Sequence, residues 1–353
     1  MTVNERYCWE LVEPGEPLRR REGAGHASGA DEVLIEVAGC GVCHTDLGYY
    51  EGQVATRGSL PVVLGHEISG RVVDTGEDAS VWLGKDVVLA AVIPCGHCDF
   101  CSAGRGNVCR HQVMPGNDID GGFATHVTVP ARGLVEVPGL PHGYELSDLA
   151  VVADAVTTPL QAVRRAEVGE GDFVVVVGTG GVGTHAVQIA AASGATVVAV
   201  DIDDARLALL ADYGAAAGVN PRDLTPREVR DRVRRHAADL GGSSVPWKIF
   251  ECSGTAAGQE TAFALLGPAA TLAVVGFTRD KVSVRLSNLM AYDATAFGSW
   301  GCPPERYPEA LGLVASGKVA LTPFTRKVPL TEAASVLAEA HHQRDPRRVI
   351  LVP

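Results

Sequence analysis

Short apolar runs, separated by glycine, proline and other turn residues, mark the first part of the chain. Examples are VLIEVAG at 33–39, GRVVDTG at 70–76, KDVVLAAVI at 85–93 and ATHVTVP at 124–130. Short β-branched runs with turn signals between them are typical of an irregular, barrel-like β domain. We therefore expect residues 1–154 to form a mainly β domain.

The pattern changes near residue 155, where buried strands begin to alternate with helical segments rich in alanine and leucine. The strand-like runs are FVVVVG at 173–178, TVVAVD at 196–201, KIFECSG at 248–254 and TLAVVGF at 271–277. This alternation predicts a parallel sheet with crossover helices over residues 155–292. The fold class is therefore α/β.

The last sixty residues return to a mixed pattern. A helical stretch is expected over 331–344 and a terminal strand over 347–353. We interpret residues 293–353 as a return to the first domain, so that the parallel-sheet domain is inserted within it.

Composition narrows the classes of function. Apolar residues make up 46% of the chain and charged residues 20%, as in ordinary globular proteins. The formal charge of −12 repels nucleic acid and anionic lipid, so neither is an expected partner. The apolar runs are shorter than the roughly 18 residues of a membrane span, and the acidic N-terminal segment does not resemble a signal peptide. We expect a cytoplasmic protein without a membrane helix.

Four of the nine cysteines occur close together in the segment CGHCDFCSAGRGNVC. In a reducing compartment, such a group indicates metal ligands before disulfides. Four thiolates from one loop can enclose a zinc ion tetrahedrally and leave no position for a substrate. We predict a structural zinc site; an iron–sulfur cluster or four incidental buried thiols are the alternatives. The ligands are Cys95, Cys98, Cys101 and Cys109.

A second group of potential ligands lies in GCGVCHTD at 39–46 and LGHEISG at 64–70. Cys43 and His66 offer one soft and one borderline ligand from different loops, with Glu67 beside the histidine. Catalytic zinc sites are commonly assembled in this way, with one position open. Such a pair alone is often structural, but the nearby four-cysteine loop favours a catalytic zinc here.

A glycine-rich turn follows the strand at 173–178. Gly178, Gly180 and Gly183 form G-x-G-x-x-G at the start of a helix, where backbone amides can approach a pyrophosphate. Asp201 ends the next strand, where a carboxylate accepts ribose hydroxyls and repels a 2′-phosphate. The parallel-sheet domain is thus expected to be a Rossmann domain that binds NAD, although Asp201 could instead cap a turn.

Together, these motifs resemble those of the zinc-dependent medium-chain alcohol dehydrogenases, in order and spacing, over essentially the whole chain. The resemblance implies a GroES-like catalytic domain with an inserted Rossmann domain, and two zinc ions per chain. It also implies Asp154, in VVADAVTTP, as the third ligand of the catalytic zinc, at a place where members carry cysteine or an acid; a helix cap is the alternative role of Asp154. Glu67 resembles the acid that can approach that metal, with a purely structural role as its alternative.

The resemblance assigns further roles around the expected catalytic zinc. Asp46 would orient His66, and Thr45 would contact the substrate oxygen and pass on its proton. A relay histidine found in many members is replaced by Gly48, which leaves the route of proton exit undefined. The remaining residues expected to contact the cofactor are His44, Thr158, Gly181, Val182 and Arg348.

A narrower resemblance is to the branch of 6-hydroxycyclohex-1-ene-1-carbonyl-CoA dehydrogenases. The segments GVCHTDLGYYEGQVATRG, MPGNDIDGGFATHVTVPARGL and NLMAYDATAFGSWGC are among those that carry it. It implies a small-molecule substrate in which a cyclic, allylic alcohol lies β to an acyl-CoA thioester. The family resemblance also implies a homo-oligomer, either a dimer or a tetramer.

Two other functions compete with oxidation of an alcohol. One is reduction of a conjugated carbon–carbon double bond, in branches that generally lack zinc ligands. The other is non-catalytic binding of a dinucleotide or a nucleic acid, with zinc in a structural role alone. The potential ligands Cys43 and His66 disfavour both.

Overall fold

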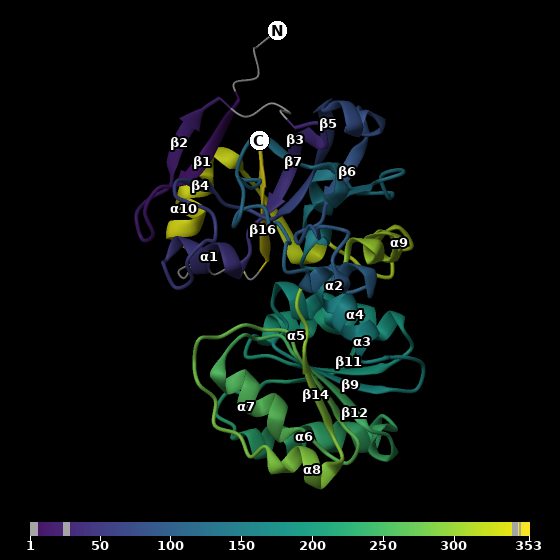
Figure 1. Ribbon diagram of the computed structural model, residues 1–353. Coiled ribbons are helices and arrows are strands. Elements are labelled where there is room, and N and C mark those ends of the chain that lie inside the picture. The colour runs from purple at the N-terminus through teal and green to yellow at the C-terminus, as the bar shows by residue number, and fades with distance from the viewer. Residues whose placement is uncertain (1–5, 24–28, 341–344, 346) are drawn as a thin grey trace. The chain divides into compact units, whose positions relative to one another are not determined.

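The computed structural model describes residues 6–23, 29–340, 345 and 347–353. The chain divides into two compact units (Figure 1). The first unit comprises Met1–Thr157, Gly301–Ala315 and Leu321–Pro353, and the second comprises Thr158–Trp300 and Ser316–Ala320. In sequence, the second unit therefore interrupts the first, and its sheet extends beyond residue 292 because a strand at 295–298 belongs to it.

The second unit is a doubly wound parallel sheet of six strands in the order β11-β10-β9-β12-β13-β14. The strand order reverses between β9 and β12, which is the place where such sheets bind ligands. Figure 1 shows α4 on one face of the sheet and α6 and α7 on the other. The strands are β9 (Phe173–Val177), β10 (Thr196–Val200), β11 (Ala215–Val219), β12 (Trp247–Glu251), β13 (Thr271–Val274) and β14 (Thr295–Gly298). The helices are α3 (Thr157–Arg165), α4 (Gly181–Ala192), α5 (Asp204–Ala211), α6 (Pro226–Asp239), α7 (Ala256–Ala264) and α8 (Ser287–Tyr292).

Local sequence explains these elements. All five residues of β9 are buried, as expected for a central parallel strand covered on both faces. Helix α6 begins with a capping box in which Thr225 and Glu228 satisfy each other's backbone amides, and Pro226 occupies its first turn. Its buried residues Val229 and Val233 pack into the same core as β9.

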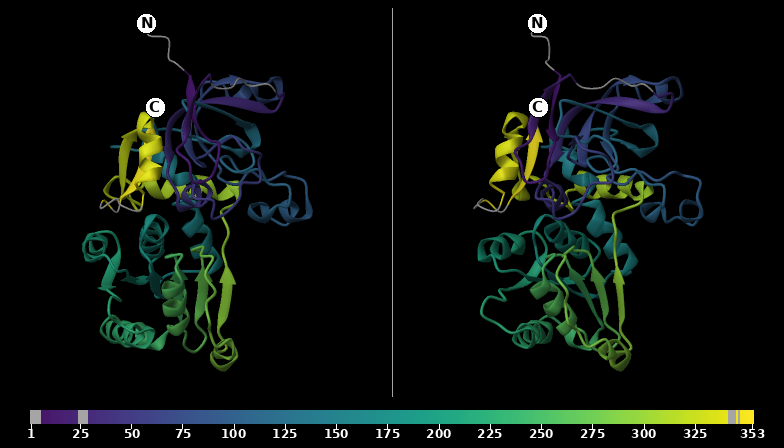
Figure 2. Two further views of the ribbon diagram at one scale, coloured as in Figure 1. Left: turned by 90° about the vertical axis from the view of Figure 1, so that its left-hand side faces the viewer. Right: turned by 60° about the vertical axis from the view of Figure 1, so that its left-hand side comes forward.

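The first unit is mainly β. Its larger sheet has the order β15-β16-β3-β5-β6-β8, with β7 paired to β3, and a three-stranded sheet has the order β2-β1-β4. The strands are β1 (Tyr7–Leu11), β2 (Arg19–Glu22), β3 (Glu32–Gly41), β4 (Val62–Val63), β5 (Glu67–Thr75), β6 (Asp86–Leu89), β7 (His126–Pro130), β8 (Leu134–Glu136), β15 (Thr325–Pro329) and β16 (Arg348–Val352). Figure 2 shows the strands of this unit from two further sides.

Several short helices of the first unit position the candidate sites. Helix α1 (His44–Tyr50) follows β3, and α2 (Asp99–Ser102) lies in the cysteine-rich loop, which also contains the 3₁₀ turn η2 (Gly106–Val108). The 3₁₀ helix η4 (Leu146–Ala153) is buried from Ser147 onward and contacts β3, β5 and α9 (Tyr307–Ala315).

The strands expected at 33–39, 70–76, 85–93, 124–130 and 347–353 are all present. The helix expected over 331–344 is shorter, because a 3₁₀ turn, η8 (Leu330–Glu332), precedes α10 (Ala333–Ala338). Residues 341–344, and residues 1–5 of the N-terminal segment, lie outside the described part of the chain. Of the helices that the structure describes, none combines the length and the apolar character needed to cross a membrane.

Candidate metal sites and active site

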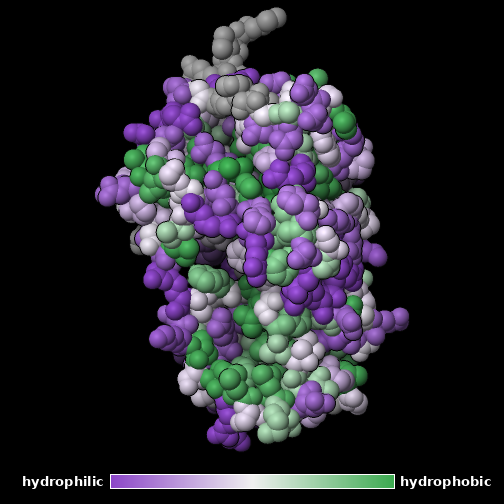
Figure 3. All heavy atoms as spheres, viewed as in Figure 1, coloured by the Kyte–Doolittle hydropathy of each residue, from purple (hydrophilic) through white to green (hydrophobic). Residues whose placement is uncertain are grey.

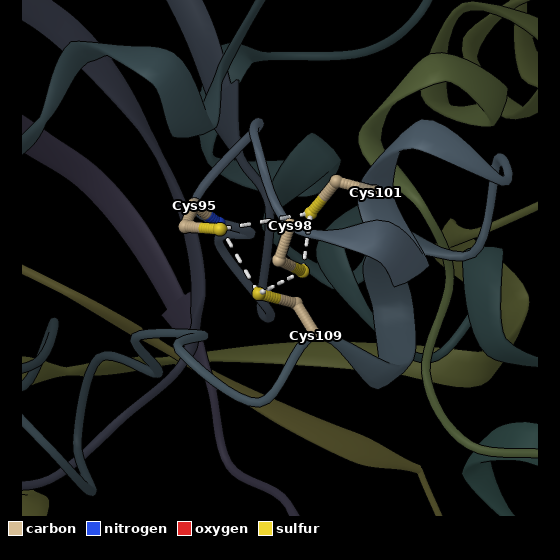
Figure 4. Close-up of side chains that lie close together, drawn as sticks. All are labelled: Cys95, Cys98, Cys101 and Cys109. Carbon is tan, nitrogen blue, oxygen red and sulfur yellow. Dashed lines mark hydrogen bonds between the residues drawn. The ribbon is translucent and has the colours of Figure 1, made fainter.

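The four cysteine thiols of the loop at 95–109 point toward one another (Figure 4). The Sγ atom of Cys98 lies 3.5 Å from that of Cys101 and 3.6 Å from that of Cys109. The Sγ atoms of Cys95 and Cys101 are 3.9 Å apart. A zinc ion bound to four thiolates at about 2.3 Å would separate the sulfurs by about 3.8 Å. The cysteine cluster therefore fits a closed tetrahedral zinc site.

Backbone amides stabilise thiolates in this loop. The amide of His97 lowers the pKa of Cys95 to about 6, and that of Cys101 lowers the pKa of Cys98. Burial and the neighbouring thiols raise the pKa of Cys101 to about 11. The thiols of Cys95 and Cys101 therefore do not ionise together without a metal, and binding of zinc would release protons.

The second cluster brings together Cys43, His66, Glu67 and Asp154, whose ligand atoms lie within 4.8 Å of one another. Cys43 precedes α1, His66 immediately precedes β5 and Glu67 begins that strand, and Asp154 follows η4. The Asp154 Oδ2 atom is 3.8 Å from Cys43 Sγ and 3.7 Å from His66 Nε2. These separations are those of donors that share one zinc ion rather than of a direct hydrogen bond.

Asp46 contacts the segments that carry the two potential ligands Cys43 and His66. This carboxylate is fully buried and accepts hydrogen bonds from the backbone amides of Cys43 (2.8 Å) and Gly65 (3.2 Å). Its Oδ1 atom lies 3.3 Å from His66 Nδ1, though without full hydrogen-bond geometry. Asp46 thus lies where a carboxylate can orient the ring of His66 so that Nε2 faces the site.

The electrostatics of the second cluster favour a cation. Burial alone would lower the pKa of His66, but Asp46, Asp154 and Cys43 together raise it well above its ordinary value. Without a metal ion, His66 therefore retains its proton in the place where a metal ion could bind. Cys43 is a soft donor, His66 a borderline one and Asp154 a hard one, and such a set suits zinc.

Arg348 and Glu67 form a buried ion pair beside this cluster. The Nε atom of Arg348 donates to Glu67 Oε2 at 2.7 Å, and the guanidinium also donates to Oε1. Glu67 Oε1 accepts a further hydrogen bond from the amide of Ala155, at 3.1 Å. Arg348 is thus engaged by Glu67 in this structure, and its contact with a pyrophosphate stays a prediction.

The other residues expected around the substrate and cofactor differ in their exposure to solvent. The Thr45 hydroxyl lies 3.7 Å from Cys43 Sγ, and Thr45 and Gly48 are half-buried on α1. His44, the first residue of α1, is exposed, whereas Thr158 on α3 is buried. Their roles toward a substrate and a cofactor stay predictions.

In the second unit, the glycine-rich turn joins β9 to α4. Gly178 has φ +82°, and a Cβ atom there would lie 2.4 Å from the backbone of Ser253. A Cβ atom on Gly183 would lie 1.8 Å from the carbonyl oxygen of Gly178, whereas Gly180 faces open space at the N-cap of α4. Gly181 and Val182 open the helix. This geometry is compatible with the predicted approach of an anion to the amides at the start of α4.

Asp201 follows β10 beside this turn and is held by several donors. Its Oδ2 atom accepts from the backbone amide and hydroxyl of Thr179, at 2.6 and 2.9 Å. Its Oδ1 atom accepts from the amide of Asp203, and Arg206 forms an ion pair with the carboxylate at 3.1 Å. Sequence reasoning missed Arg206, for which the only signal was a basic residue in the helix that follows Asp201.

Comparison with known proteins identifies the family. Residues 29–139 match the alcohol dehydrogenase GroES-like domain, and residues 181–316 match the zinc-binding dehydrogenase domain. An alcohol dehydrogenase of Geobacillus stearothermophilus is 30% identical over 323 residues, which cover 91% of each chain. The chain belongs to the zinc-binding medium-chain alcohol dehydrogenase family.

Solved structures agree with this assignment. Galactitol-1-phosphate dehydrogenase of Escherichia coli superposes with a TM-score of 0.88 at 26% identity, over 98% of this chain and 100% of that one. A protein of Sinorhizobium meliloti, described as a zinc-binding dehydrogenase and bound to NADP, gives a TM-score of 0.87 at 27% identity, over 99% and 100% of the chains. The expected α/β fold, with a GroES-like domain and a Rossmann-like parallel sheet, is confirmed.

Proposed function

We propose that the protein is a zinc- and NAD-dependent dehydrogenase that moves a hydride between a secondary alcohol and NAD. The observation that carries this proposal is the convergence of Cys43, His66 and Asp154 on one point, with Asp46 behind the histidine. Two zinc ions per chain are proposed, one at this cluster and one at the four-cysteine loop.

The residues at and beside the cluster have different proposed roles in the reaction. Cys43, His66 and Asp154 would hold the catalytic zinc, which supplies a Lewis acid that lowers the pKa of an alcohol when bound. The hydroxyl of Thr45, 3.7 Å from Cys43 Sγ, would accept the proton of the alcohol and pass on its own proton. Glu67 is held by Arg348 and by the amide of Ala155, so it stabilises the loop that carries Asp154.

A preference for NAD rests on the carboxylate of Asp201, which would repel a 2′-phosphate. Arg206 lies beside Asp201 and partly offsets that charge. We therefore infer that the protein prefers NAD to NADP. Because Arg206 offsets part of the charge of Asp201, this preference should be smaller than that of a site with an unpaired acid.

For the substrate we propose a cyclic, allylic alcohol β to an acyl-CoA thioester, on the basis of the segments that resemble that branch. The likeness to galactitol-1-phosphate dehydrogenase favours a second candidate, a sugar alcohol or its phosphate. Binding energy from a remote group, whether CoA or phosphate, can hold the carbinol in place and raise turnover.

A panel of alcohols separates these substrates. The catalytic efficiency with NAD would be measured for the acyl-CoA ester, its free acid, the simple ring alcohol and a sugar alcohol with and without phosphate. The acyl-CoA proposal predicts the highest efficiency for the ester and a reduced turnover number for the truncated forms. A simple ring alcohol as good as its CoA ester would contradict the acyl-CoA proposal, and absence of NAD reduction with every alcohol would contradict the dehydrogenase.

We also propose that the chain forms a homo-oligomer through the second unit. Strand β14 is at an edge of the parallel sheet, and apolar side chains of Phe277, Leu286, Met290 and Trp300 are exposed in the same unit. Figure 3 shows apolar side chains at the surface of the part that contains α6 to α8. Edges and apolar patches of this kind are typical of contacts between copies.

A further inference from the structure

The hydroxyl group of Tyr307 lies in the interior of the first unit, at the segment that carries Asp154. Tyr307 is 1% exposed and is the first residue of α9, far along the chain from the metal-site loops. Its hydroxyl donates to the backbone carbonyl of Ala153 at 2.5 Å and accepts from the backbone amide of Ala91 at 3.0 Å. It therefore joins the residue before Asp154 to the segment that follows β6.

The same carbonyl receives a second hydrogen bond. The hydroxyl of Thr157, a fully buried residue at the start of α3, donates to Ala153 O at 3.0 Å. Two side-chain hydroxyls, from different parts of the chain, therefore fix one carbonyl group.

The other side of Asp154 is fixed as well. The amide of Ala155 donates to Glu67 Oε1 at 3.1 Å, and Glu67 is held in turn by Arg348. The backbone is thus fastened on both sides of Asp154, while its carboxylate remains 3.7 Å from His66 Nε2 and 3.8 Å from Cys43 Sγ.

From this arrangement we infer that Tyr307 is a positioning residue for the catalytic metal site: through the carbonyl of Ala153 it sets the place of the Asp154 carboxylate. The inference rests on the proposed function, because it requires Asp154 to be a metal ligand. Asp154 follows the last turn of η4, so a small rotation of the Ala153 peptide would move its carboxylate away from Cys43 and His66. Groups that orient a metal ligand typically change metal affinity or activity by 10- to 100-fold when they are removed.

The test compares Tyr307→Phe with Tyr144→Phe in the full-length zinc-loaded protein. Tyr144 is a suitable control because its hydroxyl also accepts from a backbone amide, that of Leu321, at 3.1 Å. Three quantities would be measured: the rate at which a chelator removes each zinc ion, the visible absorption of protein with cobalt at the catalytic site, and the thermal midpoint of the metal-free protein.

We expect Tyr307→Phe to release one of its two zinc ions about tenfold faster than the wild type. We also expect it to shift the cobalt absorption bands, whereas Tyr144→Phe leaves both readouts unchanged. A Tyr307→Phe protein with a lower thermal midpoint but wild-type zinc release and cobalt bands would overturn the inference, since a merely structural hydroxyl would behave in this way.

A second variant covers the case in which Tyr307→Phe does not fold. Thr157→Val removes the other donor to the same carbonyl with little change in shape, and we expect it to accelerate release of the same zinc ion. Unchanged release and unchanged cobalt bands in Thr157→Val would overturn the inference. A wild-type protein with only one zinc ion per chain would instead contradict the proposed function, so the two failures are distinguishable.

Discussion

The carboxylate of Asp201 illustrates how a residue expected to bind a ligand is prepared by its neighbours. Thr179 and the amide of Asp203 fix its orientation, and Arg206 lies against it on the side of α5. Only one of these partners is close in sequence to the glycine-rich turn. The acid itself could be predicted from its place after a buried strand, whereas its ion pair could not.

Replacement of Asp201 by serine should weaken binding of NAD by roughly 10- to 100-fold, because a hydrogen bond to a charged group is worth about 1.5–3 kcal/mol. Binding of NADP should change less, so the preference for NAD should narrow. Catalytic efficiency with each cofactor measures this, with Asp212→Ser on the exposed end of α5 as the control. Equal efficiency with NAD and NADP in the wild type would refute the role of Asp201.

Glu251, at the end of β12, is a buried carboxyl group whose loss of a proton we expect to be linked to folding. It is fully buried, and its Oε1 atom accepts from the amides of Ser253 (2.8 Å) and Gly254 (3.2 Å). Burial raises the pKa of Glu251 above its ordinary value of 4.5, although these hydrogen bonds lower it in part. The folded protein therefore retains a proton at pH values at which the unfolded chain has lost it.

Because the pKa of Glu251 is raised in the folded protein, its contribution to the free energy of unfolding should fall as the pH rises from 4.5 through that raised pKa. The glutamine in Glu251→Gln has no proton to lose, so this variant should not show that decrease in the free energy of unfolding with rising pH. Thermal midpoints across the range from pH 4 to pH 9, with the exposed Glu260→Gln as control, measure the difference. A wild type and a Glu251→Gln protein with parallel pH profiles would show that the Glu251 proton is not linked to folding.

In the parallel sheet, the sequence pattern identifies the central strands better than the edge strands. The four central strands of the parallel sheet, β9, β10, β12 and β13, are nearly continuous apolar runs, and all four were expected. Its two edge strands were not. Strand β11 reads AAAGV and β14 reads TAFG, with several exposed residues, so neither carries the apolar signal of a buried strand.

In the candidate site too, only some of the features could be predicted from the sequence. Its ligand residues lie in recognisable motifs, so the metal clusters could be expected from the sequence. The ion pair of Arg348 with Glu67, and the hydrogen bonds of Tyr307 to Ala91 and Ala153, join segments that only the tertiary fold brings together. No local spacing encodes such contacts.

The cysteine-rich loop has little regular structure of its own, because α2 is a single short turn without a buried residue. Its order should therefore depend on zinc, which contributes folding energy directly. We expect Cys98→Ala to lose one zinc ion per chain and to lower the thermal midpoint, whereas Cys43→Ala loses the other zinc ion and stays folded. Elemental analysis and calorimetry of both variants check this. Full zinc content in Cys98→Ala would contradict the structural site.

Assembly of the protein into an oligomer should depend on the second unit. Met290 on α8 is 79% exposed, and Leu286 just before that helix is 69% exposed. Charges at these positions would have to be buried in a contact between copies, at a cost of several kcal/mol per ion.

We expect the double variant Leu286→Glu, Met290→Glu to have a lower mass by light scattering than the wild type. The control is Val81→Glu in the first unit, where valine is 65% exposed. A wild-type protein that is monomeric at micromolar concentration would contradict the proposed assembly. An unchanged oligomer in the double variant would place the contact elsewhere.

In the proposed function, Cys43, His66 and Asp154 hold the metal required for NAD-linked oxidation of an alcohol. The most direct measurement is the rate of NAD reduction by a secondary alcohol that the wild type oxidises, as zinc is returned to protein depleted of its accessible zinc. We expect wild-type activity to return in proportion to the second zinc ion bound, and Cys43→Ala to remain more than about 100-fold less active at every zinc concentration. Full activity in the depleted wild type, or in Cys43→Ala, would contradict this proposal.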